Sequence, residues 1–164
     1  MRIDKLLKYA RLTRTMANEF SKDDSTKVGA IALNPKSYSI LSTGYNGFPR
    51  GMDETIRARW ERPIKYQYVE HAERNLIYNA AADGISLEGA TIIVTLPPCV
   101  DCARGIIQTQ MKRVVTWRPE KGSAVWERWQ ASAGMSAAFF EEVGVEVVYL
   151  DDVVPQWHLG MLEV

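Results

Sequence analysis

Two short motifs constrain this 164-residue chain more than any other feature of its sequence. The first is His71-Ala72-Glu73, and the second is Pro98-Cys99-Val100-Asp101-Cys102, with residues 74–97 between them. Cys99 and Cys102 are also the only two cysteines of the chain. A fold proposed for this sequence must therefore account for the histidine, the glutamate and the closely spaced cysteine pair of these two motifs.

The spacing of the two cysteines favours a zinc site. At the first turn of a helix, side chains three residues apart can point to one ion, and the helix N-terminus favours thiolate over thiol. His71 would supply a third ligand from a different element. Three protein ligands leave one tetrahedral position open for water, which is the arrangement of catalytic zinc sites. The sequence therefore predicts a catalytic Zn2+ ion held by His71, Cys99 and Cys102.

Glu73 is placed to move protons at such a site. It follows His71 by two residues, which is too short a step for easy ligation beside His71 on a helix. It can instead lean over water on the metal, whose pKa zinc lowers to about 7. Attack of that water on a carbon atom that carries a leaving group needs several proton transfers, which a nearby carboxylate can carry out. We therefore predict that Glu73 is the catalytic proton shuttle.

The cysteine pair has two other interpretations. A C-x-x-C pair also occurs in redox motifs and as half of a structural zinc site. A structural site needs further ligands, but the chain has only two cysteines and two histidines, and the second histidine, His158, lies near the C-terminus. A redox motif would not explain His71 and Glu73. The sequence thus favours catalytic zinc over both alternatives.

Composition narrows the class of protein. The chain is 46% hydrophobic and 24% charged, and its length suffices for a single domain spanning residues 1–164. Its formal net charge of zero argues against nucleic acid as a partner. No apolar run approaches the roughly 20 residues of a membrane span, and the N-terminus lacks the apolar core of a signal peptide. Two cysteines at metal spacing fit a reducing cytosol, so we expect a cytoplasmic location.

Helical and strand patterns alternate along the chain. We predict helices over residues 4–20, 71–83, 99–110 and 134–142, and strands over residues 28–33, 39–44, 91–95, 113–117 and 145–150. The first two strands form a hairpin, and the third and fourth form a right-handed parallel crossover around a helix. The result is an α/β fold with a mixed five-stranded sheet and helices on both faces. Both metal-binding segments then open neighbouring helices at one edge of the sheet.

Three connecting segments carry less information. Residues 21–27 are polar, and a solvated loop is favoured there over a ligand-binding loop. Residues 44–51 hold three glycines and a proline, which indicates a shaped loop. Within that loop, Asn46 either only completes a turn or hydrogen-bonds a sugar hydroxyl, and the sequence leaves both open. Residues 52–64 are charged and irregular, and we interpret them as mostly solvated surface.

Three segments, Gly44–Gly51, Lys65–Asn75 and Pro98–Ala103, resemble the cytidine deaminase superfamily. The pattern H-x-E followed by P-C-x-x-C is typical of zinc-dependent nucleobase deaminases. The G-Y-N-G-x-P loop and the run Y-V-x-H-A-E-x-N point, within that superfamily, to the deoxycytidylate deaminase family. The resemblance covers about residues 4–117 and implies a three-layer cytidine deaminase-like fold.

The resemblance also implies roles for individual residues. His71, Cys99 and Cys102 would bind zinc, and Glu73 would shuttle protons. Asn46 would touch the deoxyribose, and the backbone at Ala72 would meet the amino group of the base. The reaction would convert dCMP to dUMP and ammonia and feed thymidylate synthesis.

Regulation and assembly follow from the same resemblance. Family members are typically homo-oligomers, often hexamers. Many are activated by dCTP and inhibited by dTTP, with the effector held partly by the loop around Tyr45, Asn46 and Gly47. The resemblance therefore implies a homo-oligomer that responds to these two nucleotides.

The chain departs from the family pattern after residue 117. Residues 117–133 are rich in Trp where relatives carry a Tyr-containing substrate loop. We interpret Trp126 and Trp129 as packing or oligomer contacts rather than as rings that stack on substrate, and Arg118 and Lys121 as candidate phosphate contacts. The shortage of cysteine and histidine argues against a second zinc.

Two competing functions stay open on sequence alone. One is deamination of another aminated base or nucleotide, such as dCTP, guanine or a modified cytosine nucleotide. The other is a catalytically silent regulatory subunit, against which the presence of Glu73 counts, because a scaffold has no use for that carboxylate.

Overall fold

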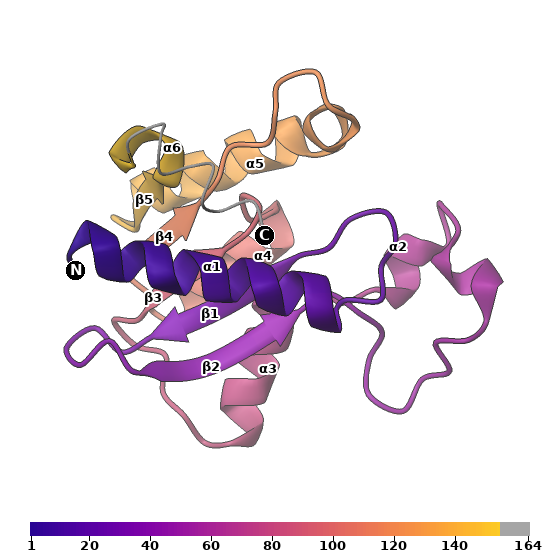
Figure 1. Cartoon of the computed structure of the whole chain (residues 1–164), viewed down its shortest axis with the longest axis horizontal. Coiled ribbons are helices and arrows are strands. Elements are labelled where there is room, and N and C mark those ends of the chain that lie inside the picture. The colour runs from indigo at the N-terminus through magenta and orange to yellow at the C-terminus, as the bar shows by residue number, and fades with distance from the viewer. Residues whose placement is uncertain (155–164) are drawn as a thin grey trace.

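The computed structural model describes residues 1–154 and contains one five-stranded mixed sheet (Figure 1). The sheet order is β2-β1-β3-β4-β5. β1 pairs antiparallel with both β2 and β3, whereas β3, β4 and β5 run parallel. The strands are β1 (Gly29–Leu33), β2 (Ile40–Tyr45), β3 (Thr91–Val94), β4 (Arg113–Thr116) and β5 (Glu146–Tyr149). The predicted hairpin, the parallel crossover and the mixed sheet are confirmed.

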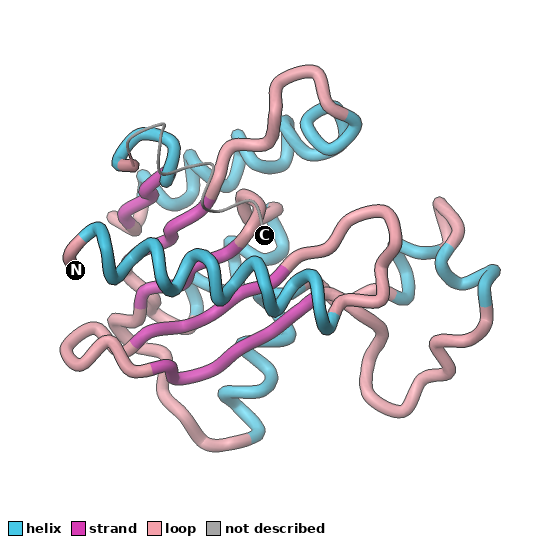
Figure 2. The backbone as a smooth tube through the Cα atoms, viewed as in Figure 1, coloured by secondary structure: helices cyan, strands magenta, loops and turns pink. Residues whose placement is uncertain are grey.

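Helices cover both faces of this sheet (Figures 1 and 2). One face packs against α1 and α6, and the other packs against α3, α4 and α5. The short elements η1 and α2 belong to the segment that protrudes between β2 and α3. The helices are α1 (Ile3–Phe20), η1 (Arg57–Trp60), α2 (Lys65–Tyr68), α3 (Ala72–Ala82), α4 (Val100–Gln108), α5 (Ala124–Glu142) and α6 (Leu150–Val153). The predicted three-layer arrangement, with helices on both faces of a mixed sheet, is thereby confirmed.

Alternation along the central strands explains the two layers of core. On β3, Ile92 and Val94 pack with α3 and α4, whereas Ile93 points to the opposite face and packs with α1. All three side chains are fully buried. Burying an aliphatic side chain of this size is worth about 1.5–3 kcal/mol, so both layers stabilise the same central strands. Those strands fix the positions at which α3 and α4 begin.

The predicted loop over residues 118–133 contains helix instead. α5 begins at Ala124, ten residues before the predicted start at residue 134. Ser123 caps this helix, because its side chain accepts a hydrogen bond from the backbone N–H of Trp126. The prediction that residues 124–133 precede the helix was therefore wrong. His158, the histidine near the C-terminus, lies outside the described residues.

Among residues 1–154, no helix combines the length and the apolar character that crossing a membrane requires.

Gly44 is required where β2 passes beneath α3. A Cβ atom at this position would lie 2.2 Å from the carbonyl oxygen of Ala72 and 2.4 Å from the backbone nitrogen of Leu76. Both atoms belong to α3, so relief requires a shift of the helix itself. We expect Gly44→Ala to lower the free energy of unfolding by at least about 1–3 kcal/mol.

Urea denaturation of purified protein measures this change. Gly134→Ala is the control, since nothing lies within 4 Å of the Cβ it would add to α5. That control should leave stability unchanged or raise it by roughly 0.5–1 kcal/mol, because alanine suits a helix interior better than glycine. Equal unfolding midpoints for Gly44→Ala and wild type would show that α3 tolerates the extra methyl group.

Candidate active site

The three predicted metal ligands lie together where two helices begin. His71 is the N-cap of α3, Cys99 is the N-cap of α4, and Cys102 lies in the first turn of α4. His71 Nδ1 is 3.4 Å from Cys99 Sγ and 3.5 Å from Cys102 Sγ. The three ligand atoms all lie within 4.8 Å of one another. Residues separated by a β-strand in the sequence thus form one compact N/S/S donor set.

The spacing of these atoms fits zinc. In a tetrahedral site with Zn–S near 2.3 Å and Zn–N near 2.0–2.1 Å, sulfur and nitrogen lie about 3.6 Å apart. The two observed S···N distances are 3.4 and 3.5 Å. Thiolate and imidazole ligands are also the set that zinc prefers. Among residues 1–154, these three side chains provide the ligand count of a catalytic site rather than that of a closed structural site.

The ionisable groups of this cluster are strongly coupled. The hydrogen bond with Cys102, assisted by His71, lowers the pKa of Cys99 to about 4. The same hydrogen bond and burial raise the pKa of Cys102, and the hydrogen bond with Cys99 raises the pKa of His71. A bound divalent cation favours the deprotonated form of every ligand, since it replaces the proton as the positive charge between them.

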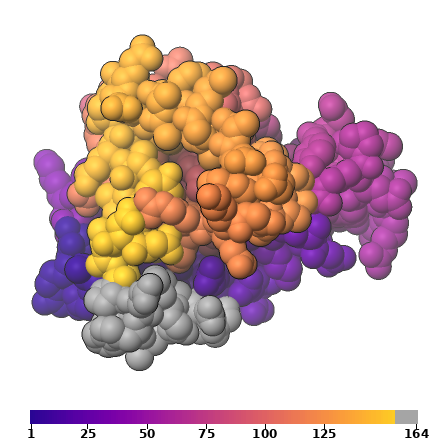
Figure 3. Space-filling model, turned by 90° about the horizontal axis from the view of Figure 1, so that it is seen from above, coloured from indigo at the N-terminus to yellow at the C-terminus, as the bar shows by residue number. Residues whose placement is uncertain are grey.

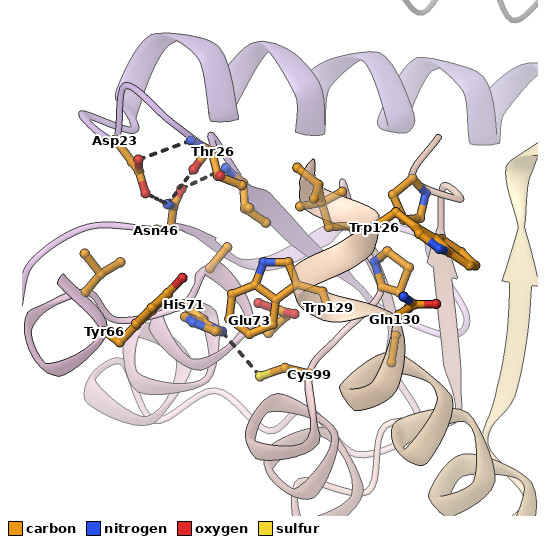
Figure 4. Close-up of a pocket in the computed structure, with 18 of the residues that line it drawn as sticks. Asp23, Thr26, Asn46, Tyr66, His71, Glu73, Cys99, Trp126, Trp129 and Gln130 are labelled. Atoms are coloured by element: carbon orange, nitrogen blue, oxygen red, sulfur yellow. Dashed lines mark hydrogen bonds between the residues drawn. The ribbon is translucent and has the colours of Figure 1, made fainter. Parts of the chain in front are cut away.

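Glu73 lies in the first turn of α3 and lines the cavity above this cluster (Figure 4). Only 4% of its surface is exposed. Burial raises the pKa of its carboxyl group above the ordinary value. A raised pKa makes the carboxylate a stronger proton acceptor, which suits a group that takes a proton from water.

The cluster opens into a cavity of about 300 Å³ (Figure 4). Its lining comes from the loops before β1 and after β2, β3 and β4, from α2 and the residues before it, from the starts of α3 and α4, from α5 and from the end of β5. Asp23, Thr26 and Asn46 belong to one side of the cavity, the polar wall, and Trp126 and Trp129 belong to the other side, the aromatic wall. Glu73 lies between the two walls. The lining includes Asp23, Thr26, Asn46, Arg62, Lys65, Tyr66, His71, Ala72, Glu73, Cys99, Arg118, Trp126, Trp129 and Gln130.

A buried ion pair stabilises the polar wall. Lys65 Nζ lies 2.6 Å from Asp23 Oδ2 and 2.6 Å from Ser25 Oγ. Asp23 is 2% exposed and Lys65 is 5% exposed. Burial acts to raise the pKa of Asp23, but hydrogen bonds from Lys65 and Ser25 outweigh it and lower that pKa.

This ion pair revises the expectation for residues 21–27. Ser21 and Asp23 are buried, and Asp23 and Thr26 line the cavity, so the prediction of a merely solvated loop was wrong for these positions. Its other residues include exposed side chains such as Lys22 and Asp24.

Asn46 lies on the same wall, and its amide is already fully hydrogen-bonded. Its Oδ1 accepts from the backbone N–H of Val28 and from Ser21 Oγ, each at 2.7 Å. Its Nδ2 donates to the carbonyl of Thr26 at 2.8 Å and to Asp23 Oδ2 at 3.1 Å. Asn46 therefore holds the loop before β1 against the end of β2, and a contact with sugar would have to share or replace one of these bonds.

The other predicted contact residues are distributed differently. Ala72 lines the cavity and is fully buried. Tyr45 is 41% exposed, stacks on Phe20 with ring centroids 5.6 Å apart, and is not part of the cavity lining. Gly47 pairs through its backbone with Glu70, just before the first metal ligand.

The aromatic wall comes from the Trp-rich segment. Trp126 and Trp129 both line the cavity. Trp129 meets the rings of His71 and Tyr66 edge to face, at centroid distances of 5.7 and 6.2 Å. The start of α5 thus lies beside the segment that carries α2 (Figure 3). Trp129 does pack against other residues, as predicted, but it packs on the candidate metal site.

A hydrogen bond connects the aromatic wall to the metal ligands. Ser132 Oγ on α5 accepts from the backbone N–H of Val100, the residue between Cys99 and the rest of α4, at 3.0 Å. The position of α5 is therefore coupled to the start of the helix that carries both cysteines.

The two candidate phosphate contacts have different surroundings. Arg118 lines the cavity, but its guanidinium is bidentate to Asp152 at 2.6 and 2.8 Å and lies 3.9 Å from the ring centroid of Tyr149. Lys121 is exposed and does not line the cavity. Two further cations, Arg62 and Lys65, line the cavity and were not predicted to do so. Arg62 is exposed and lies in the charged stretch interpreted as solvated surface, and nothing beside Lys65 in the sequence indicates that it is buried.

Comparison with known proteins agrees with this geometry. The family model for the cytidine and deoxycytidylate deaminase zinc-binding region matches residues 3–117. An uncharacterized deaminase of the luxG 3' region of Aliivibrio fischeri is 40% identical over 135 residues, which is 82% of this chain and 86% of that protein. A probable deoxycytidylate deaminase of Caenorhabditis elegans is 42% identical over 98 residues, covering 57% of this chain and 48% of the relative, so the match spans about half of that protein's length.

A solved structure has the same fold. The dCMP deaminase of cyanophage S-TIM5, crystallised with dCMP and dUMP, superposes with a TM-score of 0.72 at 25% identity, covering 91% of this chain and 98% of that one. The family model spans most of the chain and includes all three candidate ligands and Glu73. The chain therefore belongs to the cytidine and deoxycytidylate deaminase family.

Proposed function

We propose that this enzyme hydrolyses dCMP to dUMP and ammonia with one zinc ion. The observation that carries the proposal is the His71, Cys99 and Cys102 donor set with buried Glu73 beside it, opening into a cavity. Support for dCMP as the substrate comes from the relative named a probable deoxycytidylate deaminase and from the dCMP deaminase of cyanophage S-TIM5. The described residues form two core layers on one sheet, which supports a single deaminase domain spanning residues 1–164.

Each part of the site has a defined task in this reaction. His71 Nδ1 and the sulfur atoms of Cys99 and Cys102 would hold Zn2+, which supplies a Lewis acid that makes water nucleophilic at neutral pH. Glu73 takes a proton from the attacking water and delivers it to the ring nitrogen beside the reacting carbon. It then takes the proton of the hydroxyl group newly added to that carbon and passes it to the amino group, which departs as ammonia. The overall balance is dCMP plus water giving dUMP plus ammonia.

The two walls of the cavity and the backbone at Ala72 would orient the nucleotide. Trp126 and Trp129 offer large apolar faces to the pyrimidine, and aromatic side chains supply such contacts at low conformational cost. The backbone at Ala72 would meet the amino group that leaves. The opposite wall, with Asn46, offers hydrogen-bonding groups to the deoxyribose.

A substrate panel read as ammonia release tests the proposal. We expect kcat/KM for dCMP to exceed that for cytidine, dCTP and guanine, and we expect activity to disappear with the zinc. If dCMP is turned over no better than cytidine or dCTP, the assignment of dCMP as the substrate is wrong. The compound with the highest kcat/KM in the panel then replaces it. Zinc-loaded protein that deaminates nothing in the panel would instead favour a silent regulatory subunit.

Regulation and assembly extend the same proposal. The resemblance implies activation by dCTP, inhibition by dTTP and a homo-oligomer, with Tyr45, Asn46 and Gly47 near the effector. Exposure of the stacked Tyr45 and Phe20 rings supports a surface able to meet another molecule there. Repeating the panel with each nucleotide, alongside light scattering for the subunit number, examines both points. The dUMP formed would supply thymidylate synthesis, and the two free thiols suit a reducing cytoplasm.

A further inference from the structure

Three cationic side chains line the cavity, and two of them already have a carboxylate partner. Lys65 is paired with buried Asp23, and Arg118 is paired with Asp152. Arg62 forms no ion pair with any carboxylate among residues 1–154. Arg62 is therefore the cavity cation whose charge the described part of the protein leaves uncompensated.

Neutral partners hold Arg62 in place. Its Nε donates to the hydroxyl of Tyr66 and its Nη2 donates to Ser25 Oγ, both at 3.0 Å. Ser25 Oγ also receives a hydrogen bond from Lys65, so the two cations share one hydroxyl. A guanidinium has five N–H donors, and these two bonds leave the others available for a ligand.

The position of Arg62 suits the charged end of a nucleotide. Its side chain is exposed at the cavity, whereas Glu73 and Cys102 are buried at the starts of α3 and α4. A ligand whose base reaches Glu73 keeps its most strongly hydrated group toward the exposed side. Arginine matches phosphate better than other cations do, because its planar fork donates two parallel hydrogen bonds.

We propose that Arg62 anchors the 5'-phosphate of the substrate and so makes the enzyme select nucleoside monophosphates over nucleosides. The inference rests on the proposed function, since it assigns the phosphate end of the same site. Lys65 contributes indirectly, because it fixes Ser25 and thereby the guanidinium. Arg118 is the rival anchor, and using it would require breaking its bidentate pair with Asp152.

Calorimetric titration of zinc-loaded protein with dUMP and with deoxyuridine tests this assignment without requiring turnover. We expect wild type to bind dUMP at least about tenfold more tightly than deoxyuridine, as a charge-assisted phosphate contact implies. Arg62→Gln should weaken dUMP binding by about tenfold or more and change deoxyuridine binding by less than about twofold. In assays with dCMP, the same variant should raise KM and leave kcat within about threefold. Arg59→Gln is the matched control, because Arg59 lies in the same segment but outside the cavity lining.

Two other outcomes overturn the assignment to Arg62, and a third bears only on the proposed reaction. Unchanged dUMP binding in Arg62→Gln, or equal losses for dUMP and deoxyuridine, would show that Arg62 does not recognise phosphate. A phosphate-specific loss in Arg118→Gln but not in Arg62→Gln would transfer the role to Arg118. If the wild type binds dUMP through Arg62 but does not deaminate dCMP, the proposed reaction is wrong and the assignment of Arg62 as the phosphate anchor stands.

Discussion

Glu73→Gln is expected to lower kcat by about 10²–10⁴-fold while zinc content and fold stay unchanged. The amide has the size of the carboxylate but cannot accept a proton from water or return one to the base. Glu73 is not one of the three ligand residues, so its loss leaves the donor set complete. Because burial raises the pKa of Glu73, the folded state disfavours its charged form, and a neutral isostere should not lower stability.

The measurement combines turnover of dCMP with metal analysis and a thermal melt. Asp101→Asn serves as the control, since Asp101 lies between the two cysteines but its side chain pairs with Arg104 outside the cavity. That control should retain turnover within a few-fold of wild type. Zinc lost together with activity in Glu73→Gln would mean that Glu73 supports the metal. Activity kept at the wild-type level would mean that another group moves the protons.

The metal site could be predicted because its information is local. The histidine and glutamate fall within one helical turn, and the two cysteines fall within another. The fold then had only to bring two helix starts together. Hydrophobic runs located every strand to within about two residues, and the parallel crossover from β3 to β4 follows from the general handedness rule. Predictions of this kind succeed when one stretch of sequence contains the whole pattern.

The polar wall could not be predicted because its partners are distant in the sequence. Asp23 and Lys65 lie 42 residues apart. Asp23 sits in a run of polar residues typical of solvated loops, and Lys65 sits in a run of mixed apolar, aromatic and polar residues. Neither run of sequence indicates that the charge of Asp23 is neutralised by Lys65. Asn46 presents the same difficulty, because the groups that use its amide are mostly in the loop before β1, far from the glycine-rich turn.

The aromatic wall was missed for a different reason. Residues 124–133 lack a clear apolar stripe, since alanine, tryptophan and charged residues follow one another around the helix. Ser123 was the available signal for the start of α5, because serine directly before a helix-forming run is a common N-cap. Placing the helix start there would have put Trp126 and Trp129 on its first turns.

Cys99→Ala is expected to remove both the zinc and the activity. Only His71 and Cys102 would remain of the three ligands, and two ligands cannot provide a catalytic zinc site. The fold should survive, because Cys99 is partly exposed at the N-cap of α4 and belongs to neither core cluster. Circular dichroism and a thermal melt check this before activity is interpreted.

Zinc analysis of the purified variant, followed by titration with added zinc, measures the loss. Chelation of wild type provides an independent comparison and should lower both activity and melting temperature, because a ligand that binds only the folded state stabilises it. Restoring zinc should recover the chelated wild type but leave Cys99→Ala inactive, which separates loss of the ligand from loss of the metal. Full turnover by a variant free of metal would mean that the cavity deaminates without zinc, and the roles of His71 and both cysteines would have to be abandoned.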